Sequence, residues 1–574
     1  MAPLLVAAID FGTTYSGWSY SFKHEFDLEP TKVVTKRWYG DSLMSMKAPT
    51  CVLIEPDGET FTSFGYDAEN KYTSLVEAEE HDKWYFFRRF KMKLYNKNIH
   101  RDMELEDETG KKLKANFVFS VAIRFLKDDL LKVIEERMKG GVQPEEISWV
   151  LTVPAIWDGG AKQFMRESAE TAGISSDKLS IALEPEAAAI YCRLLPMENN
   201  DQDGLLSTLK TGSKVLVVDA GGGTVDIAVQ EVAENGSMKN IFKASGGDWG
   251  GTKVDEAYVR FLEDMLGKDT IDEFKRSNME DYMFMSRQFE MKKREVDPLH
   301  SDKPVVFRIS ATLPELVKQR KGMEIHDLII HSAYNNTVSI KADKLKVDMD
   351  IVRNFFKIQV DAIVDHVSNL LDPSNIGDIG AILLVGGFND CPLLQQAMKT
   401  TFVNHTIIIP NEPDLAVLKG AVIFGHKPEL ISQRVSQYTY GVKARVPFIA
   451  HVHKDSYKKI IEDGKVCCCN VFDKHIAAGQ CLIIGEAQVE KNYSPFDSSG
   501  TALGFNVYYT LEPDPMYITD EGCSLAGTLK VPIEGSGLAR SVTVRLIYGG
   551  TEIEVKAIEI ATGKVHRMKI DFLG

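Results

Sequence analysis

The stretch Leu4–Tyr15, LLVAAIDFGTTY, places an apolar run directly before an aspartate and a glycine–threonine turn. The same order returns in Val215–Thr224, VLVVDAGGGT. Glycines allow several backbone N–H groups to point at one anion, so each turn is suited to a phosphate group. An aspartate beside phosphate is favourable only if a cation such as Mg²⁺ lies between them. We therefore expect two halves that grip one polyphosphate, although either turn alone is also typical of an ordinary hairpin.

The overall composition narrows the class of protein. A chain of 574 residues is too long for a single core, so several domains are expected. The net charge of −15 argues against nucleic acid and anionic membranes as general partners. No apolar run is long enough to span a membrane, and the apolar start lacks the basic region of a signal peptide. The eight cysteines are scattered apart from Cys467–Cys469, which favours a cytoplasmic or nuclear location; we interpret these three as small residues of a strand.

The hydrophobic pattern changes near residue 430. Residues 1–427 mix strand and helix patterns, whereas the end of the chain alternates apolar and polar residues with period two, as in Val542–Leu546 and Ile553–Ala557. Such alternation indicates antiparallel sheet with one solvated face. We expect a domain of residues 1–427, a polar linker of residues 428–437 and a small β-sandwich of residues 438–574.

Further segments complete a pattern with the two turns. VLTVPA at Val150–Ala155 precedes LEPEAAAI at Leu183–Ile190, and ILLVGGF at Ile382–Phe388 precedes Ala416–Val422. In this order the segments resemble the actin-like ATPase superfamily, and the strings are similar to the seventy-kilodalton heat-shock (DnaK-like) chaperones, most of all the divergent heat shock 70 kDa protein 12 (A/B) subfamily. The resemblance covers most of residues 4–425. It implies an α/β actin-like ATPase fold, with two duplicated lobes around a nucleotide cleft, followed by a small antiparallel β-sandwich.

The resemblance also implies ATP or ADP with Mg²⁺ as the ligands and assigns roles to individual residues. Asp10 and Asp219 would hold Mg²⁺ through its waters, and Glu184 and Asp226 would orient the metal and the attacking water. Glu184 can also be interpreted as a carboxylate at a helix N-terminus, where the helix dipole favours it, and the two interpretations are compatible. The phosphates would be wrapped by Gly12, Thr13, Thr14, Tyr15, Gly221, Gly222, Gly223 and Thr224, of which Thr13 and Thr224 would also serve catalysis.

Other segments resemble the parts of the family that hold the nucleoside and cover the phosphates. Gly386, Gly387 and Phe388 would lie on one side of the base. Glu290, Lys293 and Arg294 would lie on the other, although their spacing is equally that of a plain charged helix face. The loop GGDWGG resembles the family's lid over the terminal phosphates, and glycines there suit a hinge. Its expected ligand contacts are Gly247 and Gly250.

The chain departs from the family pattern at three places. Phe388 and Asp390 stand where the family has a serine and a base-stacking arginine, and Asp390 supplies no guanidinium. The family's catalytic lysine is best matched by Arg88, with Arg89 and Lys91 as alternatives, or else these cations form a solvated basic face or a nuclear-import patch. The acidic, leucine-rich linker is missing, and with the chain ending at Gly574 we expect a β-sandwich without a helical lid.

Three functions are compatible with these features. The first is a slow ATPase with chaperone-like activity, whose nucleotide state controls how the β domain binds a protein, a peptide or a co-chaperone. The second is a nucleotide-sensing scaffold with little or no turnover. The third is a small-molecule kinase, since sugar and glycerol kinases share the fold, but the EPEAAA string and the β-sandwich argue against it.

Overall fold

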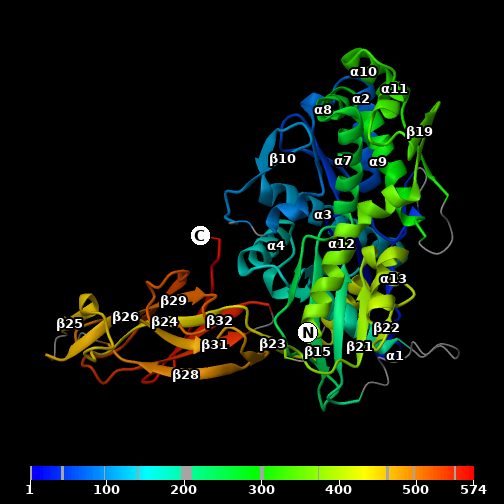
Figure 1. The fold of residues 1–574 in the computed structure, drawn as a ribbon. Coiled ribbons are helices and arrows are strands. Elements are labelled where there is room, and N and C mark those ends of the chain that lie inside the picture. Colours follow the sequence, from blue (N-terminus) through cyan, green and yellow to red (C-terminus); the bar gives the residue numbers. More distant parts are fainter. Residues whose placement is uncertain are drawn as a thin grey trace.

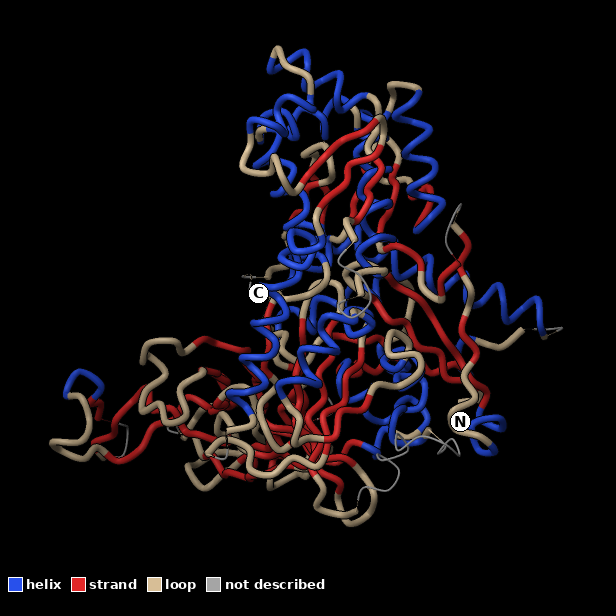
Figure 2. Tube along the Cα trace, turned by 45° about the vertical axis from the view of Figure 1, so that its right-hand side comes forward, coloured by secondary structure: helices blue, strands red, loops and turns tan. Residues whose placement is uncertain are grey.

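The chain forms a tall body from which an elongated β domain projects sideways near the base (Figure 1). The β domain consists almost entirely of strands and loops (Figure 2). The computed structural model describes residues 3–40, 44–95, 97, 99–138, 141–195, 210–297, 303–372, 374–460, 464–495, 498–548 and 551–573. Gly574, the expected end of the β domain, lies outside the described residues.

Two large sheets of the body share one topology. The first has the order β13-β12-β1-β2-β3, with β6 also paired to β2, and the second has the order β22-β21-β14-β15-β16. In each, a hairpin (β1–β2 or β14–β15) is followed by two strands parallel to its first member. The strands are β1 Leu5–Phe11, β2 Tyr15–Phe22, β3 Val34–Thr35, β6 Ala48–Pro49, β12 Ile147–Val153, β13 Leu179–Leu183, β14 Lys214–Ala220, β15 Val225–Val232, β16 Met238–Asn240, β17 Ser245–Gly247, β21 Ala381–Val385 and β22 Thr406–Ile408. The body is therefore duplicated, with one turn of interest at the end of each hairpin's first strand.

The two lobes meet at a pair of helices. Helices α5 (Glu184–Leu194) and α14 (Ala416–His426) share a buried core with residues of both sheets, such as Val6 and Val215. Each lobe also has its own core, in which the outer helices pack on the other face of its sheet. The remaining helices are α1 Lys23–Leu28, α2 Gly65–Glu77, α3 Ala115–Arg137, α4 Gly159–Thr171, α7 Thr252–Leu266, α8 Lys268–Ser277, α9 Met279–Arg294, α10 Thr312–Lys321, α11 Ile325–His331, α12 Met349–Leu370 and α13 Pro392–Thr401.

The close contact between α5 and α14 depends on a glycine, Gly420. A Cβ atom on Gly420 of α14 would lie 1.8 Å from the carbonyl oxygen of Ala187 on α5. No such contact is sterically tolerable, so only glycine permits the two helix backbones to approach this closely. Residues 187–189 of α5 are all alanine, so this part of α5 also has only small side chains.

Small sheets extend each lobe above the cleft. In the first lobe β8-β7-β9 pack with α2, and in the second β18-β20-β19 pack with α9 to α11. The small strands are β4 Trp38–Tyr39, β5 Met44–Ser45, β7 Cys51–Ile54, β8 Phe61–Phe64, β9 Tyr85–Arg88, β10 Glu104–Glu106, β11 Lys112–Lys114, β18 Val305–Arg308, β19 Val338–Lys341 and β20 Lys344–Val347. Of these added elements, β5 and α9 contribute residues to the cleft between the lobes.

The segment expected to be a polar linker is part of a sheet. Within residues 428–437, β23 (Ile431–Val435) pairs in parallel with β16 and antiparallel with β27 (Cys481–Ile483), which extends the second lobe's sheet to eight strands. Its Arg434 is 2% exposed and donates two hydrogen bonds, of 2.8 and 2.5 Å, to the buried carboxylate of Glu186 on α5. The expected polar linker therefore contains a strand of the second lobe's sheet, because a buried ion pair and ladder hydrogen bonds fix this segment against the body.

The C-terminal domain is a β-sandwich. One sheet has the order β25-β26-β24-β29-β30 and the other β28-β31-β32-β33, and their inner faces share one core that includes Val442, Phe505, Val544 and Val555. The expected alternation is present, since Val542, Val544 and Leu546 are buried while the residues between them are half-buried. Cys467–Cys469 lie in β26 and are buried. The strands are β24 Thr439–Pro447, β25 Lys458–Ile460, β26 Val466–Ile476, β28 Ala487–Tyr493, β29 Ala502–Thr510, β30 Ser524–Pro532, β31 Val542–Tyr548, β32 Ile553–Glu559 and β33 Val565–Lys569.

The β domain also contacts the first lobe through its last described residues. Leu573 is 3% exposed and belongs to the core of that lobe. Asp571 accepts a hydrogen bond of 3.0 Å from Arg101, and the backbone N–H of Phe572 donates one of 2.8 Å to Gln163 of α4. The β domain is thus held by both lobes. Among the described residues, no helix is both long and apolar enough to cross a membrane.

The helix contact at Gly420 yields a stability prediction. Gly420→Ala should lower the free energy of unfolding of the lobes by about 1–3 kcal/mol, because the added methyl group forces α5 and α14 apart. Gly504→Ala is the matched control, since Gly504 is exposed in β29 with no atom within 4 Å of an added Cβ, and it should change stability by less than about 0.5 kcal/mol. Urea unfolding followed by tryptophan fluorescence measures this, because all six tryptophans precede residue 250. Equal stability of the two variants would refute the tight helix contact.

A buried histidine predicts the pH dependence of the β domain. His475 of β26 is 3% exposed, and burial together with the nearby Lys491 lowers its pKa to about 4, although Asp473 opposes this. A lowered pKa stabilises the fold above the ordinary pKa of 6.5 and loses that contribution as the pH falls toward 4. The β domain should therefore lose about 2 kcal/mol between pH 7.5 and 5 through this group. Hydrogen exchange of β26, compared between wild type and His475→Gln, should show a weaker pH dependence in the variant, whereas exposed His326→Gln should match wild type.

Candidate functional site

A cleft of about 230 Å³ lies between the lobes, and both glycine–threonine turns line it. The turns follow β1 and β14, so the duplicated topology places them opposite each other. Most of the residues expected to hold a nucleotide face this cleft. They are Asp10, Gly12, Thr13, Thr14, Tyr15, Glu184, Asp219, Gly221, Gly222, Gly223, Thr224, Glu290, Lys293, Arg294, Gly386, Gly387 and Phe388.

The two turns lie very close together. A Cβ atom on Gly222 would lie 2.3 Å from the Oγ1 atom of Thr14, and one on Gly223 would lie 2.4 Å from that of Thr13. Side chains at these glycines would therefore push the lobes apart. The N–H groups of Gly12 and Gly221 donate within their own turns, to Ser16 Oγ and to the carbonyl oxygen of Thr224. The remaining residues of both turns face one space that a single polyanion could fill.

Several carboxylates are buried around one point of the cleft floor. Asp219 is 5% exposed, and burial together with Glu184, Asp226 and Asp10 raises its pKa well above the ordinary value. Burial also raises the pKa of Glu184, despite a hydrogen bond of 2.7 Å from Lys91. Such a concentration of negative charge is stable only with cations close by. The donor set is therefore suited to a hard cation such as Mg²⁺.

Two lysines supply part of that positive charge. Lys47 Nζ lies 2.6 Å from Asp10 Oδ2. Burial acts to raise the pKa of Asp10, but the charge and hydrogen bond of Lys47, with Lys91 and Thr152, together outweigh it and lower that pKa. Lys91 Nζ lies 2.7 Å from Glu184 Oε1. The sequence pattern named Lys91 only as an alternative and gave no signal for Lys47, because neither lies in a glycine-rich turn. Both reach the cleft through the tertiary fold.

Arg88 does not line this cleft, which corrects its expected position. The side chain of Arg88 lies 3.7 Å from Glu69 and faces a separate cavity of about 200 Å³ next to the cleft. The physical reason is the local chain path: β9 ends at Arg88, Arg89 takes a left-handed conformation with φ 51°, and a short 3₁₀ turn follows. This turn brings Lys91, rather than Arg88, toward Glu184.

Three more expected residues lie beside the cleft rather than on its surface. Asp226 is 1% exposed and accepts a hydrogen bond from the N–H of Ala155; burial and Glu184 raise its pKa to about 7. Gly247 ends β17, and Gly250 donates a hydrogen bond of 3.1 Å to the carbonyl oxygen of Gly223. The next residue of this loop, Gly251, does line the cleft. The N–H groups of Gly250 and Gly251 donate to carbonyl oxygens of the second glycine–threonine turn, which fixes the loop beside that turn.

The other end of the cleft is lined by a charged helix and an aromatic residue. On α9, the guanidinium of Arg294 lies 2.7 Å from the carboxylate of Glu290. Its central carbon lies 5.6 Å from the centre of the Tyr15 ring. Opposite them Phe388 is 8% exposed, and burial together with Asp414 raises the pKa of Asp390 to about 6. The charged face of α9 and the segment Gly386–Phe388 therefore line the same cleft, as the sequence pattern predicted.

An ion pair network joins the lobes above the cleft. Asp255 on α7 lies 2.6 Å from Lys293 of the same lobe and 2.8 Å from Arg89 of the other lobe. Glu69 on α2 similarly lies 3.2 Å from Arg287 on α9. These ion pairs bridge the two lobes on this side of the cleft.

The residues present are compatible with a metal that is bound mainly through other ligands. Across the described ranges, no cluster of three or more His, Cys, Asp or Glu side chains could coordinate a metal ion by itself. Mg²⁺ commonly keeps several waters and is held by one or two carboxylates together with phosphate oxygens. The buried Asp219, which has no lysine within ion-pair distance in the described structure, fits this mode of binding.

Comparison with known proteins identifies the class of protein to which this cleft belongs. The model of the family described as "Hsp70 protein" matches residues 87–435. Heat shock 70 kDa protein 12A of Mus musculus is 33% identical, with 99% of this chain and 92% of that protein covered. Heat shock 70 kDa protein 12B of Homo sapiens is 31% identical, with 99% and 91% covered.

A more distant relative shares only part of this length. Chaperone protein DnaK of Mycoplasmopsis agalactiae is 24% identical over 55% of this chain and 47% of its own. The chain belongs to the Hsp70 family, which confirms the expected relationship. The family implies an actin-like ATPase fold with a C-terminal β domain, and the duplicated mixed sheets and the β-sandwich are consistent with it.

Proposed function

We propose that this chain binds ATP or ADP with Mg²⁺ in the cleft, hydrolyses ATP slowly, and thereby controls how its β domain binds a protein or peptide partner. The observation that carries this proposal is the meeting of two Asp–Gly–Thr turns across one cleft, with their glycines in van der Waals reach of the opposite threonines. Membership of the Hsp70 family supports a nucleotide-binding, chaperone-like function.

The chemistry required of the chain is chiefly positioning. Thr13 and Thr224 would donate hydrogen bonds to phosphate oxygens, and Lys91 would neutralise charge that develops on the transferred group. Glu184, held by Lys91, would orient the attacking water, and Asp226, with its raised pKa, would be suited to accept a proton near neutral pH. When bound, Mg²⁺ would supply the charge that lets Asp10 and Asp219 lie beside phosphate.

The contacts of the β domain provide a route for nucleotide control. β23 belongs to the second lobe's sheet, whereas Glu552 of the β domain pairs with Arg166 of the first lobe. Relative rotation of the lobes would therefore stretch or release one of these attachments. At the far end of the β domain, Ile449, Val452 and Ile460 expose more than half of their side-chain surface, which suits the capture of an apolar peptide.

A nucleotide-sensing scaffold is the second candidate. Lys47 is already paired with Asp10, one of the two expected Mg²⁺ ligands, and Asp390 occupies the position where the family pattern has a base-stacking arginine. Both features favour binding of a nucleotide without efficient turnover. The two candidates make opposite predictions for phosphate release.

Hydrolysis is tested with the purified full-length chain. Wild type should bind ADP and release phosphate from ATP in the presence of Mg²⁺, whereas Asp10→Asn and Thr224→Val should each reduce release by about 100-fold because a charge or donor at the phosphates is lost. A single-turnover assay with labelled ATP measures this, and calorimetry measures binding. Nucleotide binding with phosphate release no greater than in the variants would establish the scaffold, and absence of binding would refute both candidates.

The corrected position of Arg88 gives a matched pair of variants. Lys91→Met removes the cation beside Glu184 and should lower single-turnover hydrolysis by about 100-fold. Arg88→Met also breaks a partly buried ion pair, but outside the cleft, so it should leave the hydrolysis rate within about threefold of wild type. Urea unfolding of both variants controls for lost stability. A larger effect of Arg88→Met on hydrolysis would restore Arg88 to the catalytic role.

A further inference from the structure

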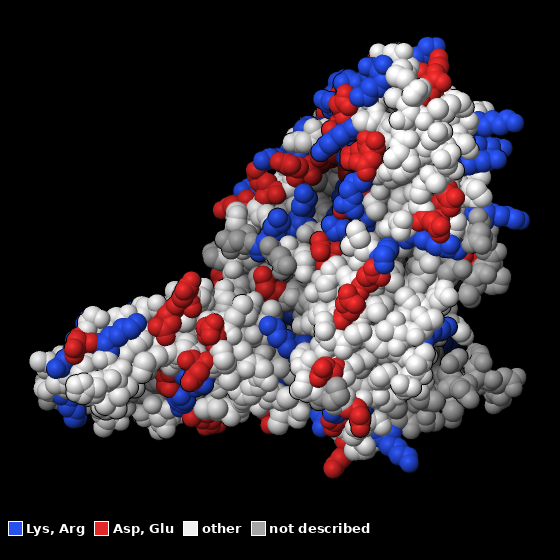
Figure 3. Space-filling view, viewed as in Figure 1, with Lys and Arg blue, Asp and Glu red and all other residues white. Residues whose placement is uncertain are grey.

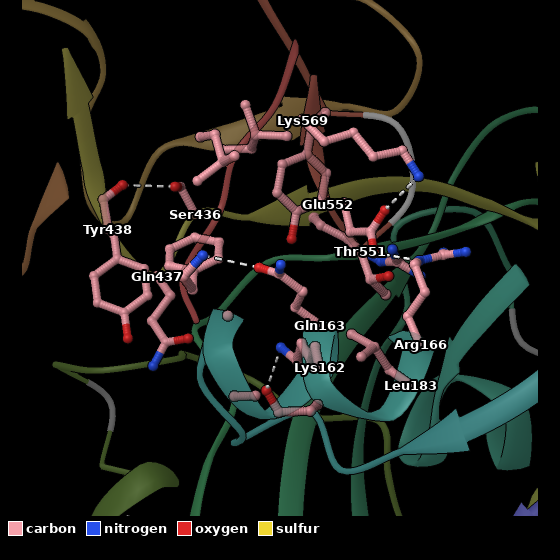
Figure 4. A pocket seen from close by; sticks show the side chains of 18 of the residues that line it. Lys162, Gln163, Arg166, Leu183, Ser436, Gln437, Tyr438, Thr551, Glu552 and Lys569 are labelled. Carbon is pink, nitrogen blue, oxygen red and sulfur yellow. Dashed lines mark hydrogen bonds and ion pairs between the residues drawn. The ribbon is translucent and has the colours of Figure 1, made fainter. Parts of the chain in front are cut away.

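A second cavity, of about 480 Å³, lies where the β domain meets both lobes (Figure 4). The space-filling view shows the concave angle between the β domain and the body (Figure 3). The walls of the cavity are α4 of the first lobe, residues 240 and 242–244 and the end of β23 of the second lobe, and residues 548, 551–553 and 569–572 of the β domain. It shares no lining residue with the cleft between the lobes. Its volume is within the range of pockets that bind small molecules.

One of the residues that line this cavity, Arg434, has a buried nitrogen without a hydrogen-bond partner in the described structure. Arg434 is 2% exposed, and its Nε and Nη2 atoms hold Glu186. Its Nη1 atom is buried and has no hydrogen-bond partner among the described residues. A buried N–H donor without an acceptor is unfavourable and points to a missing ligand. Because this nitrogen is itself buried, an acceptor in the cavity would satisfy it once the neighbouring side chains moved aside.

Lysines without counter-ions lie near this arginine. Lys162 on α4 makes one hydrogen bond of 3.2 Å, to the carbonyl oxygen of Ala155, and within the described chain no carboxylate lies in ion-pair distance of it. Burial, reinforced by the charge of Arg434, lowers the pKa of Lys162 to about 8, although the more distant carboxylates of Asp226, Glu186 and Asp158 oppose this. Lys243, exposed beside this cavity, is likewise without an ion-pair partner in the described structure. An anion would relieve the repulsion between Lys162 and Arg434.

The acidic side chains of the lining are mostly neutralised. Glu167 and Asp571 pair with Arg101, at 2.7 and 3.0 Å, and Glu552 pairs with Arg166 and Lys569. In Figure 4 the group of Arg166, Glu552 and Lys569 lies to one side, with Lys162 between it and Tyr438. Arg434 is paired with Glu186, so among the described residues the lining cations without an ion-pair partner are Lys162 and Lys243, and the lining carboxylate without one is Glu170.

Aromatic side chains line the same cavity. Tyr438, Tyr440 and Tyr548 border it, and the charge of Arg434 reaches Tyr548 strongly enough to oppose the raised pKa of that phenol. Arg434, Lys162 and Tyr548 thus lie in one neighbourhood. Aromatic surface beside cations is suited to a ligand with an apolar body and a charged end.

We propose that this cavity binds a small organic anion, with a phosphate or carboxylate group held by Lys162 and Arg434 and an aromatic body packed against the tyrosines. The ligand would contact both lobes and the β domain at once, and would stabilise their present arrangement. This inference is independent of nucleotide binding, because it concerns a separate cavity and different residues.

Isothermal titration calorimetry of the full-length chain tests the proposal, with phenyl phosphate and benzoate as probes. Phenyl phosphate or benzoate should bind saturably and at least tenfold more tightly than phenol, which lacks the charge, and inorganic phosphate, which lacks the ring. The ratio of the dissociation constants of phenyl phosphate and benzoate shows which anionic group the cavity prefers. The absence of saturable binding of both aromatic anions at millimolar concentrations would overturn the proposal.

Matched variants locate the binding site. Lys162→Gln and Lys243→Gln should each weaken binding of the better probe, with at least a tenfold loss for Lys162, whereas Lys253→Gln, on α7 outside the cavity, should not. Lys162→Gln removes an unpaired cation next to Arg434, so it should remain at least as stable as wild type. If Lys91→Gln, in the cleft, abolishes binding and Lys162→Gln does not, the anion binds at the glycine–threonine turns and the proposal is wrong.

Discussion

The fold is organised around the burial of several carboxylates at one point between two lobes. Asp10, Asp219 and Glu184 approach one another closely enough that each affects the ionisation of another. Like charges in a buried site are unfavourable unless cations compensate them. Lys47 and Lys91 compensate two of them, and the charge near Asp219 is left for a ligand. This requirement explains why the turns, the lysines and the helix that carries Glu184 must converge.

Helix α5 connects this centre to the β domain. Its first residue, Glu184, faces the cleft, and Glu186, two residues later, pairs with Arg434 of β23. Because residues two apart lie on different sides of a helix, one rigid turn contacts both the cleft and the base of the β domain. The close contact with α14 at Gly420 limits how this helix can move. Glu184 and β23 are thus separated by one turn of helix and one ion pair.

Local sequence predicted much of the fold because its signals are local. The apolar strands, the glycine–threonine turns and the alternation in Val542–Leu546 each follow from residues adjacent in the chain. The segment at residues 428–437 was misjudged for the opposite reason. Its polar residues suggest a linker, but Arg434 is neutralised by Glu186, 248 residues away in sequence. No local pattern reveals such a partner.

By itself the sequence determined that two Asp–Gly–Thr turns exist, that a β-sandwich follows, and that the chain resembles the Hsp70 family. Only the tertiary structure decided which cation faces Glu184. Arg89 is left-handed, and the chain after it turns so that Lys91 lines the cleft while Arg88 does not. The tertiary structure also decided where Lys47 binds and which cavity forms between the lobes and the β domain. Side-chain direction and charge compensation depend on distant segments, and these become neighbours only when the chain has folded.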